Sequence, residues 1–350
     1  MRMLILLLTL PAYAGDGMNA AKLERAAELL KDVGPASILV ARNGRLALHR
    51  GFGGAKPDTI YLLASITKPV TATALMLLVE RGKVSIEDPV AMYIPEFKTA
   101  DVTVRHLLTH TSGMPDMLPE NTELRRAHAP LSEFVKRAAV TPLLYPPGAG
   151  FGYQSMGTLL VGEIVERVTG ERLRDFEKRE IFDLLGMKNS FLGMGGRKIE
   201  ETALCQTPDA SAAGDALFGP NSPYWRDMGH PWGGMHSTTS DLAILMETFL
   251  RKGEYRGRRL LSAGTVAAMT RDQNGAVGKP WGLGWGLATS AVWAFFGDIV
   301  SPRTFGHSGA TGTVAWADPE SGVVTVILTT RPVSVDQDRK STRLNSSHRH

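Results

Sequence analysis

The 350-residue sequence has a single cysteine, Cys205, and this excludes an intramolecular disulfide bond. A chain of this length can bury a large hydrophobic core, so it does not need such a cross-link. No basic side chain flanks Cys205, which disfavours the alternative of a reactive thiolate. We therefore expect Cys205 to be an ordinary core residue.

Long hydrophobic runs are also absent. The apolar segment 3–10 is much shorter than the roughly 18 to 20 residues that a membrane-spanning helix needs, and no longer run follows it. The segment precedes Ala12-Tyr13-Ala14, a small-residue pattern typical of signal cleavage. We expect residues 1–14 to be the signal peptide of an exported bacterial protein, periplasmic or secreted, with a buried N-terminal strand as the alternative.

The body of the chain has no excess of charge of one sign. The whole sequence carries +4, of which Arg2 contributes one charge and residues 338–350 contribute a net three. The remaining residues are therefore neutral overall. This balance argues against a nucleic-acid partner and against an anionic membrane surface.

Residues 338–350 are unusual in their order as well as their charge. From Asp338 to His348 they resemble one reading frame of a common sequencing-library adapter. We interpret 338–350 as a non-native, adapter-derived tail and expect the native C-terminus to be missing. A natural disordered basic tail is the alternative.

The remaining residues 15–337 show the patterns of one α/β (α+β) domain. Asn43-Gly44 between the apolar segments 37–41 and 45–49 predicts a β-hairpin. Further strands are expected over 282–287, 312–317 and 323–330. Helices are expected over 22–32, about 65–81, 102–109, 131–139, 157–168, 172–185, 240–251 and 262–270.

Strands at both ends of the chain and helices between them indicate the architecture. We expect an antiparallel sheet flanked by helices and built from residues 15–64 and about 235–337. A mostly helical insertion is expected over about 65–234.

Ser65-Ile66-Thr67-Lys68 is the first candidate for catalytic chemistry. Three residues make just under one helical turn, so the hydroxyl and the amine emerge on one face. Pro69 fits only the first turn of a helix and therefore fixes the helix start near Ser65. A serine nucleophile needs an adjacent base, and a lysine can serve when burial lowers its pKa.

Two further segments carry residues with suitable chemistry. Tyr153 and Ser155 stand at the start of a predicted helix, and a tyrosine becomes a usable base only beside a cation such as Lys68. The glycine-rich segment 306–312 leads into a predicted C-terminal strand. Its glycines would let a ligand approach the backbone closely. A backbone N–H there could complete an oxyanion hole with that of Ser65.

The order and spacing of these motifs resemble the beta-lactamase-related family of penicillin-recognising serine hydrolases. The family includes class C-type beta-lactamases, DD-peptidases and family VIII-type esterases, and the resemblance runs from about Leu39 to Thr330. The residues that carry it are Ser65-x-x-Lys68, Tyr153-x-Ser155, His307-Ser308-Gly309, Arg50-Gly51-Phe52-Gly53, Asp88-Pro89, Leu107-Leu108-Thr109-His110-Thr111-Ser112-Gly113-Met114, Pro147-Gly148, Gly170 and Leu185-Gly186-Met187.

The resemblance implies a beta-lactamase/transpeptidase-like fold and a role for each motif. Ser65 would be acylated, and Lys68 and Tyr153 would share the proton transfers, with the Lys68 cation favouring a Tyr153 phenolate. The N–H groups of Ser65 and Ala310 would hold the oxyanion. The residues expected to contact substrate are Ser155, His307, Ser308, Gly309 and Ala310.

The resemblance also limits the choice of substrate. An ester, a peptidoglycan-type D-amino-acid peptide and a beta-lactam are the candidates, and no cofactor or metal is expected. His307 stands where beta-lactamases usually have a lysine, and Ser155 stands where asparagine is common. Both differences weaken the grip on a beta-lactam, so esterase or peptidase activity is favoured.

Three other hypotheses account for less of the sequence. An α/β-hydrolase needs Gly-x-Ser-x-Gly, which Gly306 to Ala310 lacks, and a later histidine, which only the tail offers. His106 and His110 have zincin-like spacing but lack the glutamate of that motif. A non-catalytic penicillin-binding or sensor protein of the same fold remains an alternative. The sequence does not predict the oligomeric state.

Overall fold

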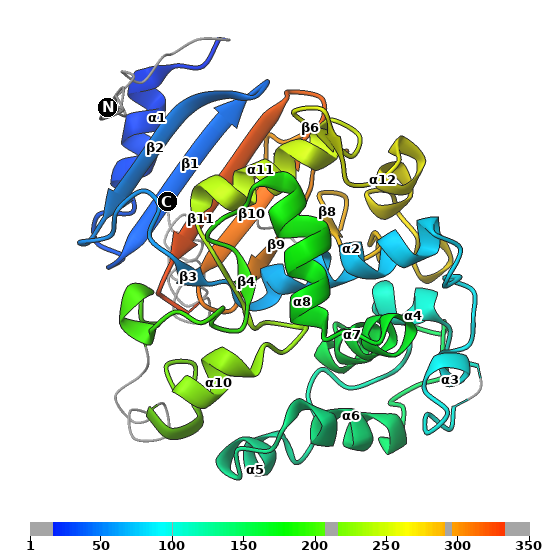
Figure 1. The fold of residues 1–350 in the computed structure, drawn as a ribbon. Helices are drawn as coiled ribbons and strands as arrows, with labels where there is room; N and C mark the ends of the chain where they lie inside the picture. Colours follow the sequence, from blue (N-terminus) through cyan, green and yellow to red (C-terminus); the bar gives the residue numbers. More distant parts are fainter. Residues whose placement is uncertain (1–16, 100, 207–215, 291–295, 333–350) are drawn as a thin grey trace, which may run out of the picture.

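The computed structural model describes residues 17–99, 101–206, 216–290 and 296–332 (Figure 1). The expected signal peptide over 1–14 and the expected tail over 338–350 lie outside these residues. Within the described ranges, no helix has the length and apolar character needed to cross a membrane.

A six-stranded antiparallel sheet forms one layer of the fold. Residues from both ends of the chain build it, because β1 pairs with β11 along its whole length. The strands lie in the order β2 (Arg45–Phe52), β1 (Ala36–Arg42), β11 (Val323–Thr329), β10 (Thr313–Asp318), β9 (Phe305–Gly309) and β8 (Gly286–Leu287). The predicted sheet is therefore confirmed.

The N-terminal hairpin forms where Asn43-Gly44 predicts it. Both residues have positive φ, 51° and 75°, as a tight two-residue hairpin turn requires. β8 and β9 differ from expectation. Of the strand predicted over 282–287 only the last two residues pair, because Leu283 N and Gly284 N donate to Met269 O and Leu108 O instead of to a neighbouring strand. β9 is a full strand, although the sequence predicts this segment only as the approach to a strand. Its two glycines lower the β propensity and hide the strand.

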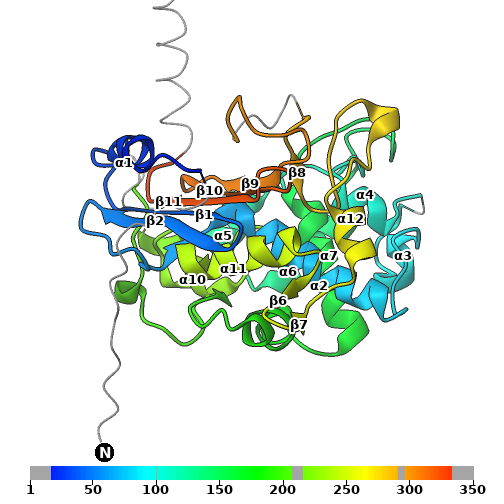
Figure 2. The ribbon, with the colours of Figure 1, turned by 90° about the horizontal axis from the view of Figure 1, so that it is seen from above.

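Helices cover both faces of the sheet, as the edge-on view in Figure 2 shows. The helix α1 (Ala20–Glu28) packs on the outer face, where Ala27 joins Ile38, Val40, Leu48 and Phe52 in a small apolar cluster. On the inner face α11 (Thr239–Leu250) contacts β1, β10 and β11. The inner face is thus buried, whereas α1 covers only the part of the outer face near β1 and β2, and Val314 and Trp316 of β10 stay partly exposed.

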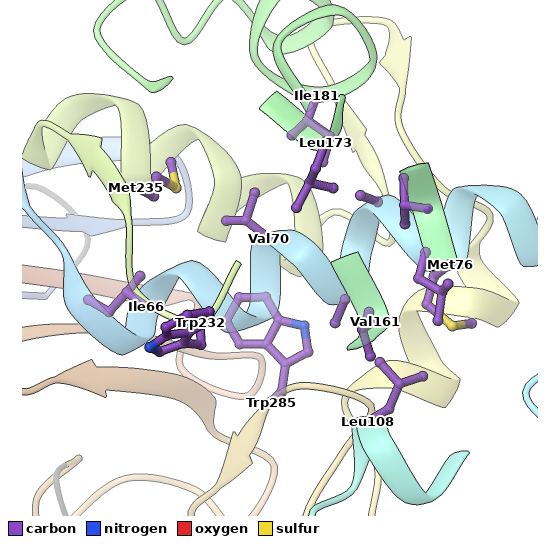
Figure 3. Close-up of a cluster of buried hydrophobic side chains, with 14 of the residues drawn as sticks. Ile66, Val70, Met76, Leu108, Val161, Leu173, Ile181, Trp232, Met235 and Trp285 are labelled. Carbon is purple, nitrogen blue, oxygen red and sulfur yellow. The ribbon is translucent and has the colours of Figure 1, made fainter. Parts of the chain in front are cut away.

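The helix α2 (Thr67–Glu80) runs through the centre of the molecule. It follows a 3-10 turn over Ala64–Ile66, has Pro69 in its first turn and stops before Gly82, as predicted. Every residue from Thr67 to Leu78 is buried, so other elements surround this part of α2 on all sides. Figure 3 shows the packing around it, with labelled side chains Ile66, Val70, Met76, Leu108, Val161, Leu173, Ile181, Trp232, Met235 and Trp285.

The middle of the chain is mainly helical, as expected. Its helices and 3-10 turn are α3 (Val90–Tyr93), α4 (Val104–Leu108), α5 (Asn121–Arg126), α6 (Leu131–Val140), α7 (Ser155–Thr169), α8 (Leu173–Glu177), η3 (Ile199–Glu201) and α10 (Pro223–Met228). The helix predicted over 172–185 is divided, because a π-helical segment follows α8 over Lys178–Asp183.

The remaining elements are short. A second sheet of three strands, β3 (Tyr61–Leu62), β5 (Met235–Ser237) and β4 (Phe191–Leu192), joins the helical region to the main layer. The sequence does not predict this sheet, because strands of only two or three residues are too short to show an alternation of apolar and polar side chains. The other elements are β6 (Glu254–Tyr255), β7 (Arg258–Arg259), α12 (Ala263–Met269) and η5 (Gly275–Val277).

The central position of α2 leads to a stability prediction. Leu75 is fully buried in α2, so Leu75→Ala should lower the free energy of unfolding by about 2–5 kcal/mol through lost burial and a residual cavity. Leu46→Ala is the control, because Leu46 is 51% exposed on β2 and its loss should cost under about 0.5 kcal/mol. Urea unfolding measures both. Equal effects would contradict the central role of α2.

Candidate active site

Ser65 lies on the 3-10 turn that opens α2 and faces a cavity. Ala64 before it has φ 49°, a left-handed conformation that costs a residue with a side chain about 1 to 2 kcal/mol. Lys68, three residues later, brings its Nζ within 3.0 Å of Ser65 Oγ. The first motif therefore forms a direct hydroxyl–amine contact.

The Lys68 side chain is 2% exposed and nearly enclosed by protein. Its Nζ also donates a hydrogen bond of 3.1 Å to Trp232 O. Burial lowers the pKa of Lys68 to about 7, although Asp116 opposes this shift by favouring the charged form. At neutral pH the amine is therefore divided between its neutral and charged forms, and the neutral form can accept a proton.

Tyr153 stands beside both residues. Lys68 Nζ lies 4.7 Å from the centre of the Tyr153 ring, and the hydroxyl oxygen of Tyr153 is buried. Burial raises the pKa of Tyr153, and a hydrogen bond with Ser65 only partly opposes this. The Asp116 carboxylate acts in the same direction as burial, so the resting Tyr153 favours its protonated form, which can donate a proton.

Ser155 is 3% exposed at the first residue of α7. Its hydroxyl donates to Asp116 Oδ1 at 2.7 Å, and its N–H donates to the same oxygen at 2.9 Å. Asp116 lines the cavity and influences Lys68 and Tyr153 electrostatically. The sequence does not identify Asp116, because an aspartate in a Pro/Met-rich loop has no distinguishing signal.

The third motif lies within β9 rather than before a strand. His307 is fully buried, and burial together with Lys68 lowers its pKa to about 3. Its Nδ1 is 2.7 Å from Ser308 O. His307 is therefore neutral at physiological pH and offers no cation to a substrate. This agrees with the expectation that a histidine in place of a lysine weakens the grip on a beta-lactam. Ala310 lines the cavity, whereas His307, Ser308 and Gly309 are buried in β9 and are not among the lining residues.

β9 is packed directly against the segment before Ser65. A Cβ on Gly309 would stand 2.0 Å from Leu63 O, so only glycine fits there. Thr311 Oγ1 donates to Leu62 O at 2.9 Å, and Thr313 Oγ1 donates to Leu63 O at 2.7 Å. These two threonines, which the sequence does not single out, fix the end of β9 relative to the Ser65 turn.

The cavity in front of Ser65 has a volume of about 470 Å³. Its wall is mainly apolar and aromatic, with Asp116 and Arg125 as charged groups. Arg125 stacks on Trp225 at 3.8 Å and donates to Phe218 O. The lining residues are Leu62, Ala64, Ser65, Asp116, Met117, Arg125, Tyr153, Ser155, Cys205, Gln206, Pro220, Trp225, His230, Trp232, Gly233, Ala310, Thr311 and Pro332.

Cys205, His106 and His110, the alternative candidates for a reactive thiol or a metal site, have structural roles. Cys205 is buried at the cavity wall, 7% exposed. His106 caps α4 through a contact between its Nδ1 and Thr103 N, and His110 Nδ1 accepts from Gln154 N. Across the described ranges, no cluster of three or more His, Cys, Asp or Glu side chains has a geometry that could hold a metal ion.

Comparisons with known proteins agree with this geometry. A model of the Beta-lactamase family matches residues 24–348. A protein of Escherichia coli strain K12 named "Putative D-alanyl-D-alanine carboxypeptidase" is 30% identical, over 87% of this chain and 80% of its own length.

Two solved structures have a similar fold. The penicillin-binding protein homologue from Caulobacter crescentus superposes with a TM-score of 0.73 at 25% identity, over 89% of this chain and 92% of its own. A family VIII carboxylesterase superposes with a TM-score of 0.71 at 22% identity, over 89% and 91%, which supports the fold alone. With a family match over nearly its whole length, the chain belongs to the Beta-lactamase family and is a serine hydrolase.

Proposed function

We propose that the protein hydrolyses acyl compounds through a covalent acyl-enzyme on Ser65, with Lys68 and Tyr153 as acid–base partners. The observation that carries the proposal is the 3.0 Å contact between Ser65 Oγ and a buried amine. A solvated lysine with a pKa of about 10.4 would be protonated at neutral pH. Lys68, with a pKa of about 7, can take the serine proton.

Acylation then proceeds in two steps. Ser65 Oγ attacks the acyl carbon while its proton passes to Lys68 Nζ, and the N–H groups of Ser65 and Ala310 donate to the resulting oxyanion. The intermediate collapses when the bond to the leaving group breaks. The protonated Tyr153 hydroxyl gives its proton to the leaving group and regains one from the Lys68 ammonium.

Deacylation repeats the sequence with water. A water molecule attacks the ester carbon and loses one proton through Tyr153 to the neutral Lys68. Ser65 Oγ leaves and recovers this proton, so one water is consumed per bond cleaved. The products are a carboxylic acid and the alcohol or amine released in the first half-reaction.

The substrate class follows from the groups at the cavity. Neutral His307 and a Ser155 hydroxyl already bonded to Asp116 provide neither the cation nor the amide that favours beta-lactams. The wall containing Trp225 and Trp232 suits an apolar acyl group. We therefore propose an ester or a D-amino-acid peptide as substrate. The names of the carboxypeptidase relative and the carboxylesterase neighbour are consistent with these two classes.

A substrate panel tests this choice. Intact-mass measurement after incubation with p-nitrophenyl butyrate, a D-Ala-D-Ala peptide and nitrocefin reports acylation, and steady-state rates report turnover. We expect turnover of the ester or the peptide to exceed that of nitrocefin. Acylation without turnover of any of them would instead identify a sensor protein.

Removal of the nucleophile gives a sharper test. Ser65→Ala should lower kcat for the preferred substrate by at least about 10³-fold and abolish the mass increase. Ser132→Ala on the exposed side of α6 is the matched control and should leave kcat unchanged. Full activity of Ser65→Ala would refute the proposed mechanism.

The Lys68 pKa predicts the acidic side of the pH profile. Because the base must be neutral, kcat/KM should rise with pH through a midpoint of about 7. Asp116 favours the charged amine, so Asp116→Asn should move this midpoint to lower pH while the amide still accepts from Ser155. A midpoint that stays in place or rises would show that Lys68 is not the titrating group.

A further inference from the structure

A buried carboxyl group lies behind the active site and has no part in the proposed mechanism. Glu177, the last residue of α8, is fully buried, and its Oε2 has no hydrogen-bond partner among the described residues. Its Oε1 contacts only Thr71 Oγ1, at 3.2 Å. A charged carboxylate in this position would have one oxygen desolvated without a compensating hydrogen bond, which disfavours the charged form.

The two contacts of the Thr71 hydroxyl indicate whether Glu177 is protonated. Thr71 Oγ1 lies 3.2 Å from Glu177 Oε1 and 2.9 Å from Pro231 O. A hydroxyl has one proton and can donate to one of these oxygens at a time. Since the carbonyl only accepts, both contacts are hydrogen bonds only when Glu177 carries a proton on Oε1 and donates it to Thr71.

Pro231 O, the last acceptor in the hydrogen-bonded series from Glu177 through Thr71, belongs to the segment that holds Lys68. Trp232, next to Pro231, accepts the 3.1 Å hydrogen bond from Lys68 Nζ through its own carbonyl. Met235 N donates to Thr67 Oγ1 at 3.1 Å. Segment 231–235 is therefore attached to α2 at Thr67, Lys68 and Thr71, and Glu177 is bonded to the last of these.

Among the described residues, no ion pair offsets a charge on Glu177, and on α8 itself Arg174 pairs with Asp227 and Asp175 pairs with Arg172. None of the charged side chains on the elements packed against α8 forms a salt bridge with it in the described part of the chain. These side chains are Lys68, Glu80 and Arg81 on α2, Glu163, Glu166 and Arg167 on α7, and Lys178, Arg179, Glu180 and Asp183 on the π-helical segment. Burial consequently raises the pKa of Glu177 to about 8.

We propose that Glu177 is a positioning residue whose protonated carboxyl, through Thr71, holds the Pro231–Trp232 carbonyls in the arrangement that orients the Lys68 amine. When Glu177 ionises, it needs the Thr71 proton for itself. Pro231 O then loses its donor, and the neighbouring Trp232 carbonyl is no longer fixed against Lys68. This inference rests on the proposed function, because Lys68 is taken as the base.

The pH profile of Glu177→Gln tests the proposal. Ionisation of Glu177 with a pKa of about 8 should reduce wild-type kcat by up to about tenfold between pH 7 and pH 9. The glutamine amide keeps a donor for Thr71 and cannot ionise. Its kcat should therefore not fall over the same range, while KM changes little.

Two further variants separate positioning from general stability. Thr71→Val interrupts the chain of hydrogen bonds at nearly constant volume and should lower kcat at every pH. Glu166→Gln is the matched control on α7, where the carboxylate accepts from Leu173 N and the amide oxygen can do the same. Its pH profile should follow the wild type. A Glu177→Gln profile that also follows the wild type would overturn the proposal.

A measurement without turnover distinguishes this proposal from the proposed function. Infrared difference spectra of Ser65→Ala should contain the C=O stretch of a protonated carboxylic acid at pH 7 that fades toward pH 9. The band should be missing from the Ser65→Ala, Glu177→Gln double variant. Its absence from both proteins would refute a protonated Glu177, whatever the activity of Ser65. Its presence alongside an inactive wild type would contradict only the proposed function.

Discussion

Desolvation of the Lys68 ammonium group is the constraint on which the site depends. An amine 2% exposed cannot keep its ordinary proton affinity without a strong anionic partner, and the one carboxylate that influences it, Asp116, is itself on the surface. The same low-dielectric environment keeps Tyr153 protonated and His307 neutral. A single physical effect thus sets the charge of three groups around Ser65.

That burial is produced by the assembly of distant segments around α2. The helix itself provides Ser65 and Lys68, and segment 231–235 covers the amine from the opposite side. β9, from the C-terminal part, packs on the backbone before Ser65. The site therefore exists only when the sheet and the helical region are folded together, even though its two reacting atoms are three residues apart.

The sequence identifies those features that have a local physical cause. Asn43-Gly44 requires a tight turn, and Pro69 can stand only near a helix start, so the hairpin and the position of Ser65 are predictable. Asp116, Thr311, Thr313 and Glu177 act through neighbours that are far away in the chain, and nothing in their own surroundings distinguishes them. β9 is difficult to recognise because the close approach of its backbone to Leu63 and to β10 requires glycines, which also weaken the strand signal.

The tight contact between Gly309 and Leu63 has a consequence for how new specificities can arise in this protein. The main chains of Gly309 and Leu63 set the spacing between the Ser65 turn and the end of β9, and the Thr311 and Thr313 side chains tie the two segments together. Within the aromatic wall of the cavity, Trp225 on α10 comes from another segment, whereas Trp232 also holds Lys68 through its carbonyl. Substitutions at Trp225 can reshape the space for the acyl group without altering the frame that carries the reacting atoms. Chemistry and substrate choice are thus separately adjustable in one scaffold.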